Sequence, residues 1–337
     1  MRIIIFNDRP DYKGGTLYYQ RLKQILLEHG VQVTIKTAMP TFSIIFRFDL
    51  LIMKYLGVSL ISYLRCFYCL LKGYNVIYGS NVFIPKLLRK ITKLKIVAWF
   101  PDFQMHDLPH MFTAYQIKSR KRFEAILLSY CDSIVVQNAH DRKRMKQISD
   151  CEKIHVIKFY QPRVAPLSVN SDRLTNKPYI LVAAQGWRHK RLDCILRAYD
   201  RSTKKYDLII IGSPFDPRDP EYSENLRYNL TKNTACYLGF VSQEEKQMLM
   251  VGAAGLLNYS LYEGWNSSIE EAISFELPVI LSDIPIHREQ LPEALFVKDE
   301  EQLSSVFSGK LPVEKRYVYE NVYARRRETI ESFVSNL

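Results

Sequence analysis

The chain has 337 residues, more than a single hydrophobic core normally organises, so we expect two domains. Hydrophobic residues make up 47% of the sequence and aromatic residues 12%, a composition that excludes general disorder. The net charge of +12 is unevenly placed: residues 1–161 carry 25 Lys and Arg against 11 Asp and Glu, whereas residues 162–337 carry 22 against 24. Only the N-terminal half is basic, and we expect it to face an anionic partner.

The N-terminus opens on Ile3-Ile4-Ile5-Phe6, a strand-like run much shorter than the apolar core of a signal peptide. We therefore expect a cytoplasmic protein whose six cysteines are reduced. Cys66 and Cys69 form a single C-x-x-C within an apolar helical run. This setting favours core packing over a zinc or redox site.

Strands and helices alternate through the first half of the chain, as in a Rossmann-like domain. Strands are predicted at 1–6, 31–36, 75–78, 95–100, 133–136 and 154–157, and helices at 17–29, 118–130 and 140–148. Gly14 and Gly15 stand where the first helix begins. Glycines there let the backbone approach a ligand, and a helix N-terminus favours an anion. An ordinary turn is the alternative interpretation.

The segment 41–73 is densely apolar. Its cations Arg47, Lys54, Arg65 and Lys72 fall close to one line on a helix. They interrupt any run of about 20 apolar residues, so a transmembrane span is not expected. One interpretation is a helix or hairpin on a membrane surface, with its cations toward lipid phosphates. The other is a buried helix pair whose cations reach solvent.

More positive charge follows on a helix predicted from Pro85, where four cations share one broad face: Lys86, Arg89, Lys90 and Lys93. A solvated face is the simplest interpretation. Together with the segment 41–73, it supports an anionic membrane surface as a partner and a peripheral location on the inner face of the membrane. We recognise no nucleic-acid-binding motif and expect no nucleic-acid partner.

Residues 162–178 contain prolines and small polar residues without periodicity, which is typical of a linker. It separates an N-terminal domain, 1–161, from a C-terminal domain, 179–311. Strands are predicted at 179–184, 206–211, 236–238, 255–259 and 277–283, with helices at 244–251 and 313–337.

Glu263 and Glu271 stand eight positions apart, between the strands at 255–259 and 277–283. Ser267 or Ser268 is predicted to cap a short helix whose first amides suit a phosphate or diphosphate. Eight residues of helix span about 12 Å, so each carboxylate can serve hydroxyls on one side of a diphosphate. Two solvated carboxylates at a helix start are the alternative.

This stretch resembles the E-x7-E motif of glycosyltransferase family 4, whose members are retaining enzymes of GT-B fold. The resemblance covers about 179–292 and includes Lys190, the Gly-x-Val turn at 239–241 and Pro278-Val279-Ile280, in family order. It implies an α/β fold of two Rossmann-like doubly wound domains facing each other across a cleft. A C-terminal helix, within 312–337, would cross back to the first domain.

The resemblance also implies roles for individual residues. Glu263 would contact the donor sugar, Glu271 the nucleotide ribose, and Lys190 with Arg188 the diphosphate. The implied donor-binding set is Gly14, Gly15, Arg188, Lys190, Val241, Glu263, Gly264, Trp265, Asn266, Ser267 and Glu271.

Three further features of the sequence bear on how the donor would be bound. The usual Glu-Gly-Phe-Gly continues here as Glu263-Gly264-Trp265-Asn266, which leaves the backbone N–H of Asn266 for the diphosphate. The usual Gly-x-Gly turn is Gly212-Ser213-Pro214. The sequence has no Asp-x-Asp triplet, so we expect donor binding without a metal and no cofactor besides the nucleotide-sugar substrate.

The stretch Pro101–Pro109 follows a predicted strand and resembles a segment of family members that build bacterial polysaccharides. Polar residues at such a strand end are candidates for acceptor contact. His106 is the candidate catalytic residue, because the family often places a histidine there. Asp102 or Asp107 is the candidate for polarising an acceptor hydroxyl. A loop histidine without function is the alternative.

The implied function is transfer of a sugar from a nucleotide-diphosphate sugar to a lipid-linked glycan. The product would be a bacterial capsule, O-antigen or exopolysaccharide. Glu263, Lys190 and His106 would form the catalytic set. A nucleotide-sugar epimerase of the same fold is one alternative, which requires a histidine and an acid in the donor site. A non-catalytic partner subunit of GT-B fold is the other.

Overall fold

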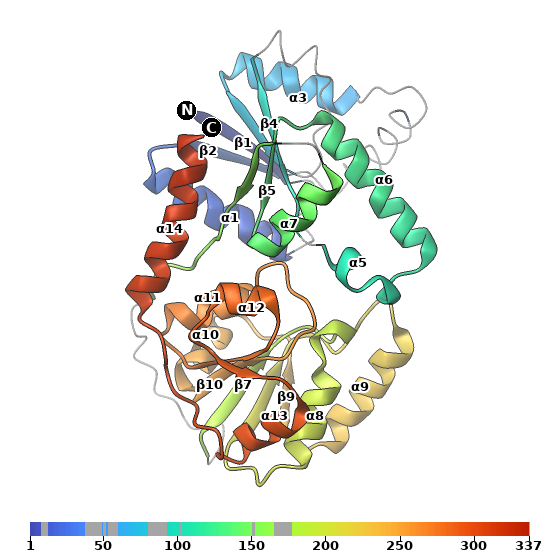
Figure 1. Ribbon diagram of the computed structural model, residues 1–337, viewed down its shortest axis with the longest axis vertical. Helices are drawn as coiled ribbons and strands as arrows, with labels where there is room; N and C mark the ends of the chain where they lie inside the picture. The colour runs from blue at the N-terminus through green and yellow to red at the C-terminus, as the bar shows by residue number, and fades with distance from the viewer. Residues whose placement is uncertain are drawn as a thin grey trace. The chain divides into compact units, whose positions relative to one another are not determined.

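The computed structural model describes residues 1–7, 13–37, 49, 52, 60–79, 93–101, 103–149, 152–164 and 177–336. The chain forms two compact units, each a sheet covered by helices (Figure 1). Unit 1 comprises Met1–Phe159 and Arg325–Leu337, and unit 2 comprises Tyr160–Ala324. The end of the chain is therefore grouped with its beginning.

Unit 1 contains a six-stranded sheet with the order β2-β1-β3-β4-β5-β6, all neighbours parallel. The strands are β1 (Arg2–Asn7), β2 (Gln32–Thr37), β3 (Val76–Gly79), β4 (Lys95–Trp99), β5 (Ser133–Val136) and β6 (Ile154–Val156). The helices are α1 (Lys13–Glu28), α3 (Leu60–Leu71), α5 (Gln104–Asp107), α6 (Ala114–Tyr130) and α7 (Ala139–Ile148), with a 3-10 turn at Pro109–Met111. Parallel strands covered on both faces read as continuous apolar runs, which is why the sequence predicted them.

The two faces of the unit 1 sheet are covered by different helices. Cys66 and Cys69 of α3 are buried and unbridged, and they pack in one core cluster with Ile77. The preference for core packing of this C-x-x-C is confirmed. On the other face, Tyr78 meets the aromatic rings of α1 and the ring of Phe333, which lies on α14 (Tyr319–Ser335).

Unit 2 contains a second six-stranded parallel sheet, with the order β12-β11-β10-β7-β8-β9. The strands are β7 (Tyr179–Ala183), β8 (Asp207–Ile211), β9 (Cys236–Gly239), β10 (Gly255–Asn258), β11 (Val279–Ser282) and β12 (Leu295–Val297). The helices are α8 (Leu192–Asp200), α9 (Pro220–Lys232), α10 (Gln243–Gly252), α11 (Ser267–Ser274), α12 (Pro285–Gln290) and α13 (Glu300–Phe307).

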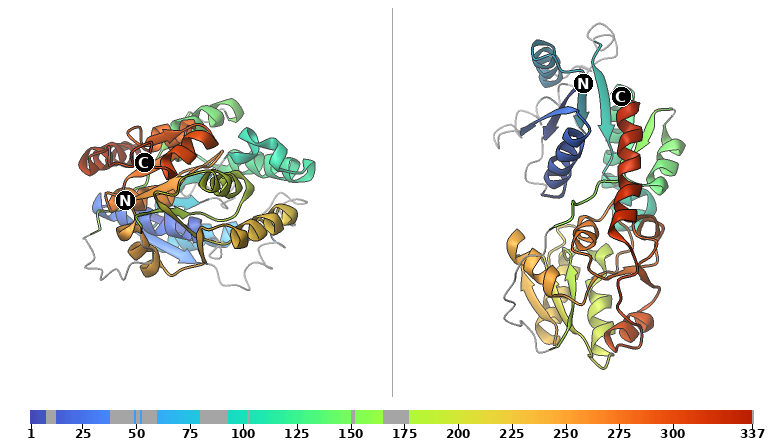
Figure 2. Two further views of the ribbon diagram at one scale, coloured as in Figure 1. Left: turned by 90° about the horizontal axis from the view of Figure 1, so that it is seen from below. Right: turned by 90° about the vertical axis from the view of Figure 1, so that its left-hand side faces the viewer.

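Alternate residues of the unit 2 strands enter separate core clusters, because successive side chains of a strand point to opposite faces. Ile180 and Val182 of β7 pack with α8, α9 and α13. Tyr179 and Leu181 pack with α10 and α11. Helices thus cover both faces of the sheet, as the further views show (Figure 2). Among the described residues, no helix is long and apolar enough to span a bilayer.

Several boundaries differ from the sequence predictions. The helix α1 begins at Lys13, so Gly14 and Gly15 lie within its first turn and not in a preceding loop. The last helix begins at Tyr319 and not at 313, because Tyr317 is buried and donates its hydroxyl hydrogen to the Leu277 carbonyl. The helix α9 was not predicted because its apolar periodicity is weak; only three of its residues are buried.

Candidate functional site

The carboxyl ends of β7, β8 and β10 lie side by side, and the loops that follow them are joined. Gly212 has a φ of +122°, and a Cβ there would lie 2.1 Å from the Ala184 carbonyl oxygen. A Cβ on Gly186 would lie 2.6 Å from the Pro214 carbonyl carbon. Two glycines therefore allow the loops after β7 and β8 to pack backbone against backbone. This packing fixes the start of the loop that carries Lys190.

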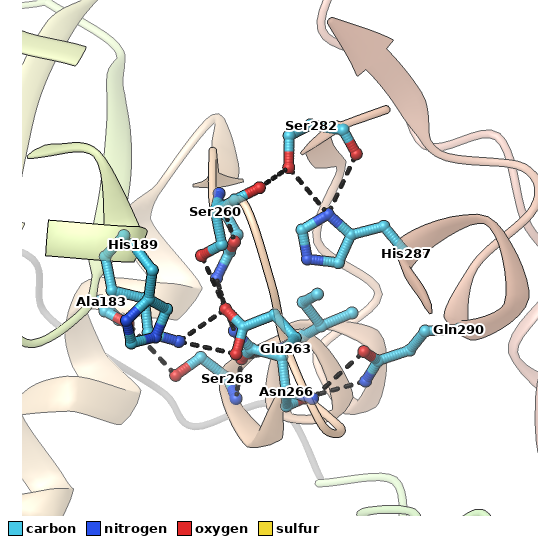
Figure 3. A network of polar contacts seen from close by, with 12 residues as sticks. Ala183, His189, Ser260, Glu263, Asn266, Ser268, Ser282, His287 and Gln290 are labelled. Atoms are coloured by element: carbon cyan, nitrogen blue, oxygen red, sulfur yellow. Dashed lines mark hydrogen bonds and ion pairs between the residues drawn. The ribbon is translucent and has the colours of Figure 1, made fainter. Parts of the chain in front are cut away.

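Glu263 is the centre of a buried hydrogen-bond network in the loop after β10 (Figure 3). The Lys190 ammonium lies 2.6 Å from each of its carboxylate oxygens. Oε1 also accepts from Asn258 at 3.1 Å, Ser260 at 2.7 Å and the side chain of Asn266 at 2.9 Å. Within the described part of the chain, Oε2 accepts only from Lys190. Oε1 is therefore saturated, and Oε2 is the oxygen with capacity for a further donor.

The network keeps Glu263 ionised. Burial is the largest single effect and raises the pKa of Glu263, but the charge and hydrogen bonds of Lys190, together with the neighbouring His287 and His189, outweigh burial and bring this pKa to about 2. Two buried histidines flank the network. Burial lowers the pKa of His189 to about 3 and the pKa of His287 to about 4. Both rings are therefore neutral near pH 7, and Lys190 supplies the positive charge.

The start of α11 corrects one expectation. The N-cap is Asn266, not Ser267 or Ser268: its side-chain oxygen accepts from the amides of Ser268 at 2.8 Å and Ile269 at 3.2 Å. Its own backbone N–H, expected to serve a diphosphate, donates to Gln290 Oε1 at 3.2 Å. Gln290 returns a bond from Nε2 to the Asn266 carbonyl at 2.9 Å (Figure 3). The amides of this helix start are largely satisfied within the protein.

Glu271 lies in α11 and is buried. Its Oε2 is 2.5 Å from the ammonium of Lys246, which belongs to α10. Lys246 also donates to the Ser268 hydroxyl at 3.3 Å. The structure thus pairs each predicted glutamate with one lysine: Glu263 with Lys190, and Glu271 with Lys246.

The remaining predicted donor residues differ in their surroundings. Arg188 is exposed and pairs with Asp219 at 2.7 Å, so the structure does not join it to the Glu263 network. Trp265 is buried, Gly264 and Ser267 are half-buried, and Val241 packs partly buried against the core beside α10 and α11.

In unit 1, the predicted acceptor residues are engaged in separate pairs. His106 Nε2 lies 3.1 Å from both carboxylate oxygens of Glu124 in α6. Asp107 pairs with His140 at 2.8 Å and with Arg144 at 2.6 Å, both in α7. Asp102 lies outside the described residues.

The predicted line of surface cations is wrong at Arg65. This side chain is buried in α3, with its guanidinium 4.4 Å from the centre of the Phe6 ring. An aromatic face accommodates the planar cation, so the helix turns it inward. Lys72 is exposed just beyond the end of α3. Arg47 and Lys54 lie outside the described residues.

The exposed face of α3 is apolar. Its members recur at helical spacing and are 40–71% exposed: Leu60, Tyr63, Leu64, Phe67, Leu70 and Leu71. We call this set the α3 stripe. Large exposed apolar patches on a soluble domain mark sites of interaction.

Sequence reasoning missed five residues of the unit 2 site: Asn258, Ser260, Lys246, His287 and Gln290. Asn258 is the last residue of the buried strand β10 and Ser260 follows it closely, a position that points to a ligand-binding edge. Lys246 and Gln290 carried no local signal, because each meets its partner only after α10 and α12 pack beside α11. Among the described residues, no group of three or more His, Cys, Asp or Glu side chains is arranged to hold a metal ion.

The Glu263 network lies within a segment that a comparison with known families matches. Residues 167–304 match the family of glycosyl transferases group 1. The chain is also similar to the O-antigen chain mannosyltransferase RfbU of Salmonella typhimurium, with 31% identity over 164 residues. This similarity covers 46% of this chain and 43% of the relative, less than half of each.

Solved structures resemble the whole chain. The Anabaena protein Alr3699/HepE, in complex with UDP and glucose, has a TM-score of 0.69 at 14% identity and covers 100% of both chains. Sucrose-phosphate synthase from Thermosynechococcus elongatus has a TM-score of 0.65 at 14% identity and the same coverage. At this identity the likeness concerns the fold, and it confirms the predicted GT-B fold.

Proposed function

We propose that this chain is a glycosyltransferase that takes a sugar from a nucleotide-diphosphate sugar. The observation that carries the proposal is the Glu263 network: a buried, ionised carboxylate at the carboxyl edge of a parallel sheet, paired with Lys190. Ligands of open α/β sheets bind at this edge. The family match at 167–304 includes this whole network.

The two oxygens of Glu263 suggest how the donor is held. Oε1 is saturated by side chains of the loop, which fixes the carboxylate. Among the described residues, Oε2 accepts only from Lys190, and it has the capacity to accept from a hydroxyl of the donor sugar. The ammonium of Lys190 carries three N–H groups, so it can contact a diphosphate oxygen while still paired with Glu263. The pair would thus hold the sugar and the leaving group next to each other.

The proposed reaction proceeds with retention and without a metal. The bond from the anomeric carbon to the diphosphate oxygen breaks, and the acceptor oxygen bonds to the same face of that carbon. The acceptor proton passes to the departing diphosphate. Lys190 stabilises the negative charge that develops there. His106, paired with Glu124, is proposed to serve the acceptor.

The proposed acceptor is a lipid-linked glycan of a bacterial capsule, O-antigen or exopolysaccharide. The relative named for O-antigen chain mannosyl transfer supports this class. A peripheral location on the inner face of the membrane is supported by the α3 stripe and by the excess of 25 Lys and Arg over 11 Asp and Glu in residues 1–161. The α3 stripe, and not the predicted line of cations in the segment 41–73, is the feature of this helix that supports a membrane location.

A thermal-shift panel of nucleoside diphosphates and their sugars tests the proposal. Saturating ligand at about 100 times its Kd should stabilise the native state by about 2.7 kcal/mol and raise Tm. Glu271→Ala should weaken the shift. Absence of any shift, or an unchanged shift in Glu271→Ala, would contradict the donor site.

A turnover assay separates the reaction classes. Release of nucleoside diphosphate should depend on a glycan acceptor and persist in EDTA. Interconversion of nucleotide sugars without an acceptor would instead identify an epimerase. Binding without either reaction would identify a non-catalytic subunit.

A further inference from the structure

Lys246 is the least expected residue of the unit 2 site. It lies on α10, outside the glutamate motif, and its ammonium is 2.5 Å from Glu271 Oε2. It also donates to the Ser268 hydroxyl, which donates to the carbonyl of Ala183 at 3.4 Å (Figure 3 shows the bond from Ser268 to Ala183). One chain of contacts therefore joins α10, the first turn of α11 and the carboxyl end of β7.

Burial differs between the two members of this pair. The Glu271 side chain is 4% exposed and the Lys246 side chain 19%. A ligand that reaches the Glu271 carboxylate therefore also meets the Lys246 ammonium. In the described chain the Lys246 ammonium forms an ion pair with Glu271 and donates one hydrogen bond, to Ser268. Because it has three N–H groups, it retains the capacity to donate to a ligand while it stays paired with Glu271.

The backbone amides at the start of α11 are already hydrogen-bonded, so an oxygen-rich ligand there depends on side-chain donors such as Lys246. The Asn266 side chain and Gln290 already satisfy three backbone amides that an oxygen-rich ligand would otherwise use. Side-chain donors must replace them. Lys246 contacts the first turn of α11 through Ser268, so its ammonium is a side-chain donor close to these occupied amides.

We propose that Lys246 positions Glu271 and completes a subsite for the vicinal hydroxyls of a ribose. The inference rests on the proposed function and on the role that the sequence resemblance implies for Glu271, contact with the ribose of the donor. The carboxylate accepts hydrogen bonds from the hydroxyls, and a further N–H of Lys246 donates to one hydroxyl oxygen. A 2′-deoxyribose leaves one buried partner unsatisfied. The subsite therefore selects ribonucleotides over 2′-deoxyribonucleotides.

The test is calorimetric titration of the full chain with ADP, GDP, UDP, CDP and dTDP. The best ribonucleotide is then compared with its 2′-deoxy counterpart. Wild type should bind the ribonucleotide at least about tenfold more tightly, a difference of about 1.4 kcal/mol. Lys246→Met should weaken ribonucleotide binding about tenfold and bind both nucleotides equally, since one charged hydrogen bond is lost. Lys246→Arg, which keeps the charge, should fold and show an intermediate preference.

A matched control comes from another ion pair of unit 2. Lys315 lies 2.5 Å from Glu276 and is 40% exposed, and Lys315→Met should leave both affinities unchanged. A double-mutant cycle that combines Lys246→Met with Glu271→Gln tests whether Lys246 affects nucleotide affinity through Glu271. The double variant should lose no more affinity than the worse single variant, because residues of one unit are not additive.

The outcomes separate this inference from the proposed function. If no nucleoside diphosphate binds wild type, the proposed function fails, and this inference fails with it. If wild type prefers the ribonucleotide and Lys246→Met or Lys246→Arg keeps the full preference, only the role of Lys246 is overturned. A wild-type preference for the 2′-deoxy nucleotide overturns it as well. If Lys246→Met does not fold, the Lys246→Arg result decides.

Discussion

The two units have the same architecture, but their titratable side chains are arranged differently. In unit 2, side chains from the loop after β7, from the end of β10 with the loop after it, and from α10 converge on Glu263 and Glu271, and each glutamate has a lysine partner. In unit 1, His106 and Asp107 are neighbours in sequence yet bind different helices, α6 and α7. The difference shows that one sheet edge supports a connected site, whereas the other supports separate pairs within the described residues.

A connected network and separate pairs respond differently to the loss of one member. Removing a member of a buried network leaves several partners without hydrogen bonds, and the cost includes their desolvation. Removing one member of a separate pair leaves only a single partner without its hydrogen bond, so the cost is smaller. Variants of the connected network should therefore lose more stability than variants of the separate pairs.

Glu263→Gln should cause the largest loss of stability, about 3–5 kcal/mol, because it leaves the Lys190 charge buried without a counter-charge. The measurement is urea unfolding at pH 7.5. The double variant Glu263→Gln with Lys190→Met should recover part of the loss, since it removes the unpaired charge. In unit 1, Glu124→Gln should cost about 1 kcal/mol, because one hydrogen-bonded pair is altered and the Gln oxygen can still accept from His106. Equal losses in the two units would refute the contrast.

Acid should destabilise unit 2 through its buried histidines. The pKa of His287 is lowered to about 4 in the folded protein, so below pH 6.5 the unfolded chain takes up a proton that the native state does not. Stability is present above pH 6.5 and is lost as pH falls toward 4. The loss from His287 alone is about 3 kcal/mol for a shift of this size. His189, whose pKa is lowered to about 3, acts in the same direction.

The readout is the free energy of unfolding from urea titrations between pH 7.5 and 4. His287→Asn should flatten this pH dependence relative to wild type. The exposed His110 provides the control, and His110→Asn should keep the wild-type slope. A His287→Asn variant with the wild-type slope would show that the buried ring does not carry the effect.

The sequence predicted most of what depends on local pattern. Apolar runs located every strand of the unit 1 sheet and every strand of the unit 2 sheet except β12. The spacing of the two glutamates and the resemblance to a family motif singled out Glu263, Glu271 and Lys190. Contacts between distant segments were not predictable. The bond from the Asn266 amide to Gln290 joins residues 24 positions apart, and that from Lys190 to Glu263 joins residues 73 apart. Arg65 was misplaced because helical spacing gives a line of residues but not the direction in which it faces.

The Asn266 side chain combines two functions, and its removal should have an intermediate effect. Asn266→Ala removes the N-cap of α11 and one donor to Glu263, for a loss of about 1–2 kcal/mol in urea unfolding. Asn266→Ser keeps a capping oxygen but cannot reproduce the amide donor, so it should recover only part of the loss. Full recovery in Asn266→Ser would mean that capping alone explains the residue.

The smallest effect on stability is expected at the α3 stripe, where function and folding should separate. Leu64 and Phe67 are 71% and 62% exposed, so changing both to Ser should alter the free energy of unfolding by less than about 0.5 kcal/mol per site. Binding to vesicles with anionic lipid should nevertheless fall, because insertion depends on the apolar area buried at the interface.

Co-sedimentation with such vesicles gives the readout, with Tyr228→Ser as the control. Tyr228 is 62% exposed on α9 of unit 2, and its loss should not change vesicle binding. If the double variant of α3 is destabilised while vesicle binding stays at the wild-type level, the stripe serves packing and not the membrane. Unit 1 would then lack its proposed anionic surface partner, whereas the donor site of unit 2 would stand unaffected, because its network lies wholly within Tyr160–Ala324.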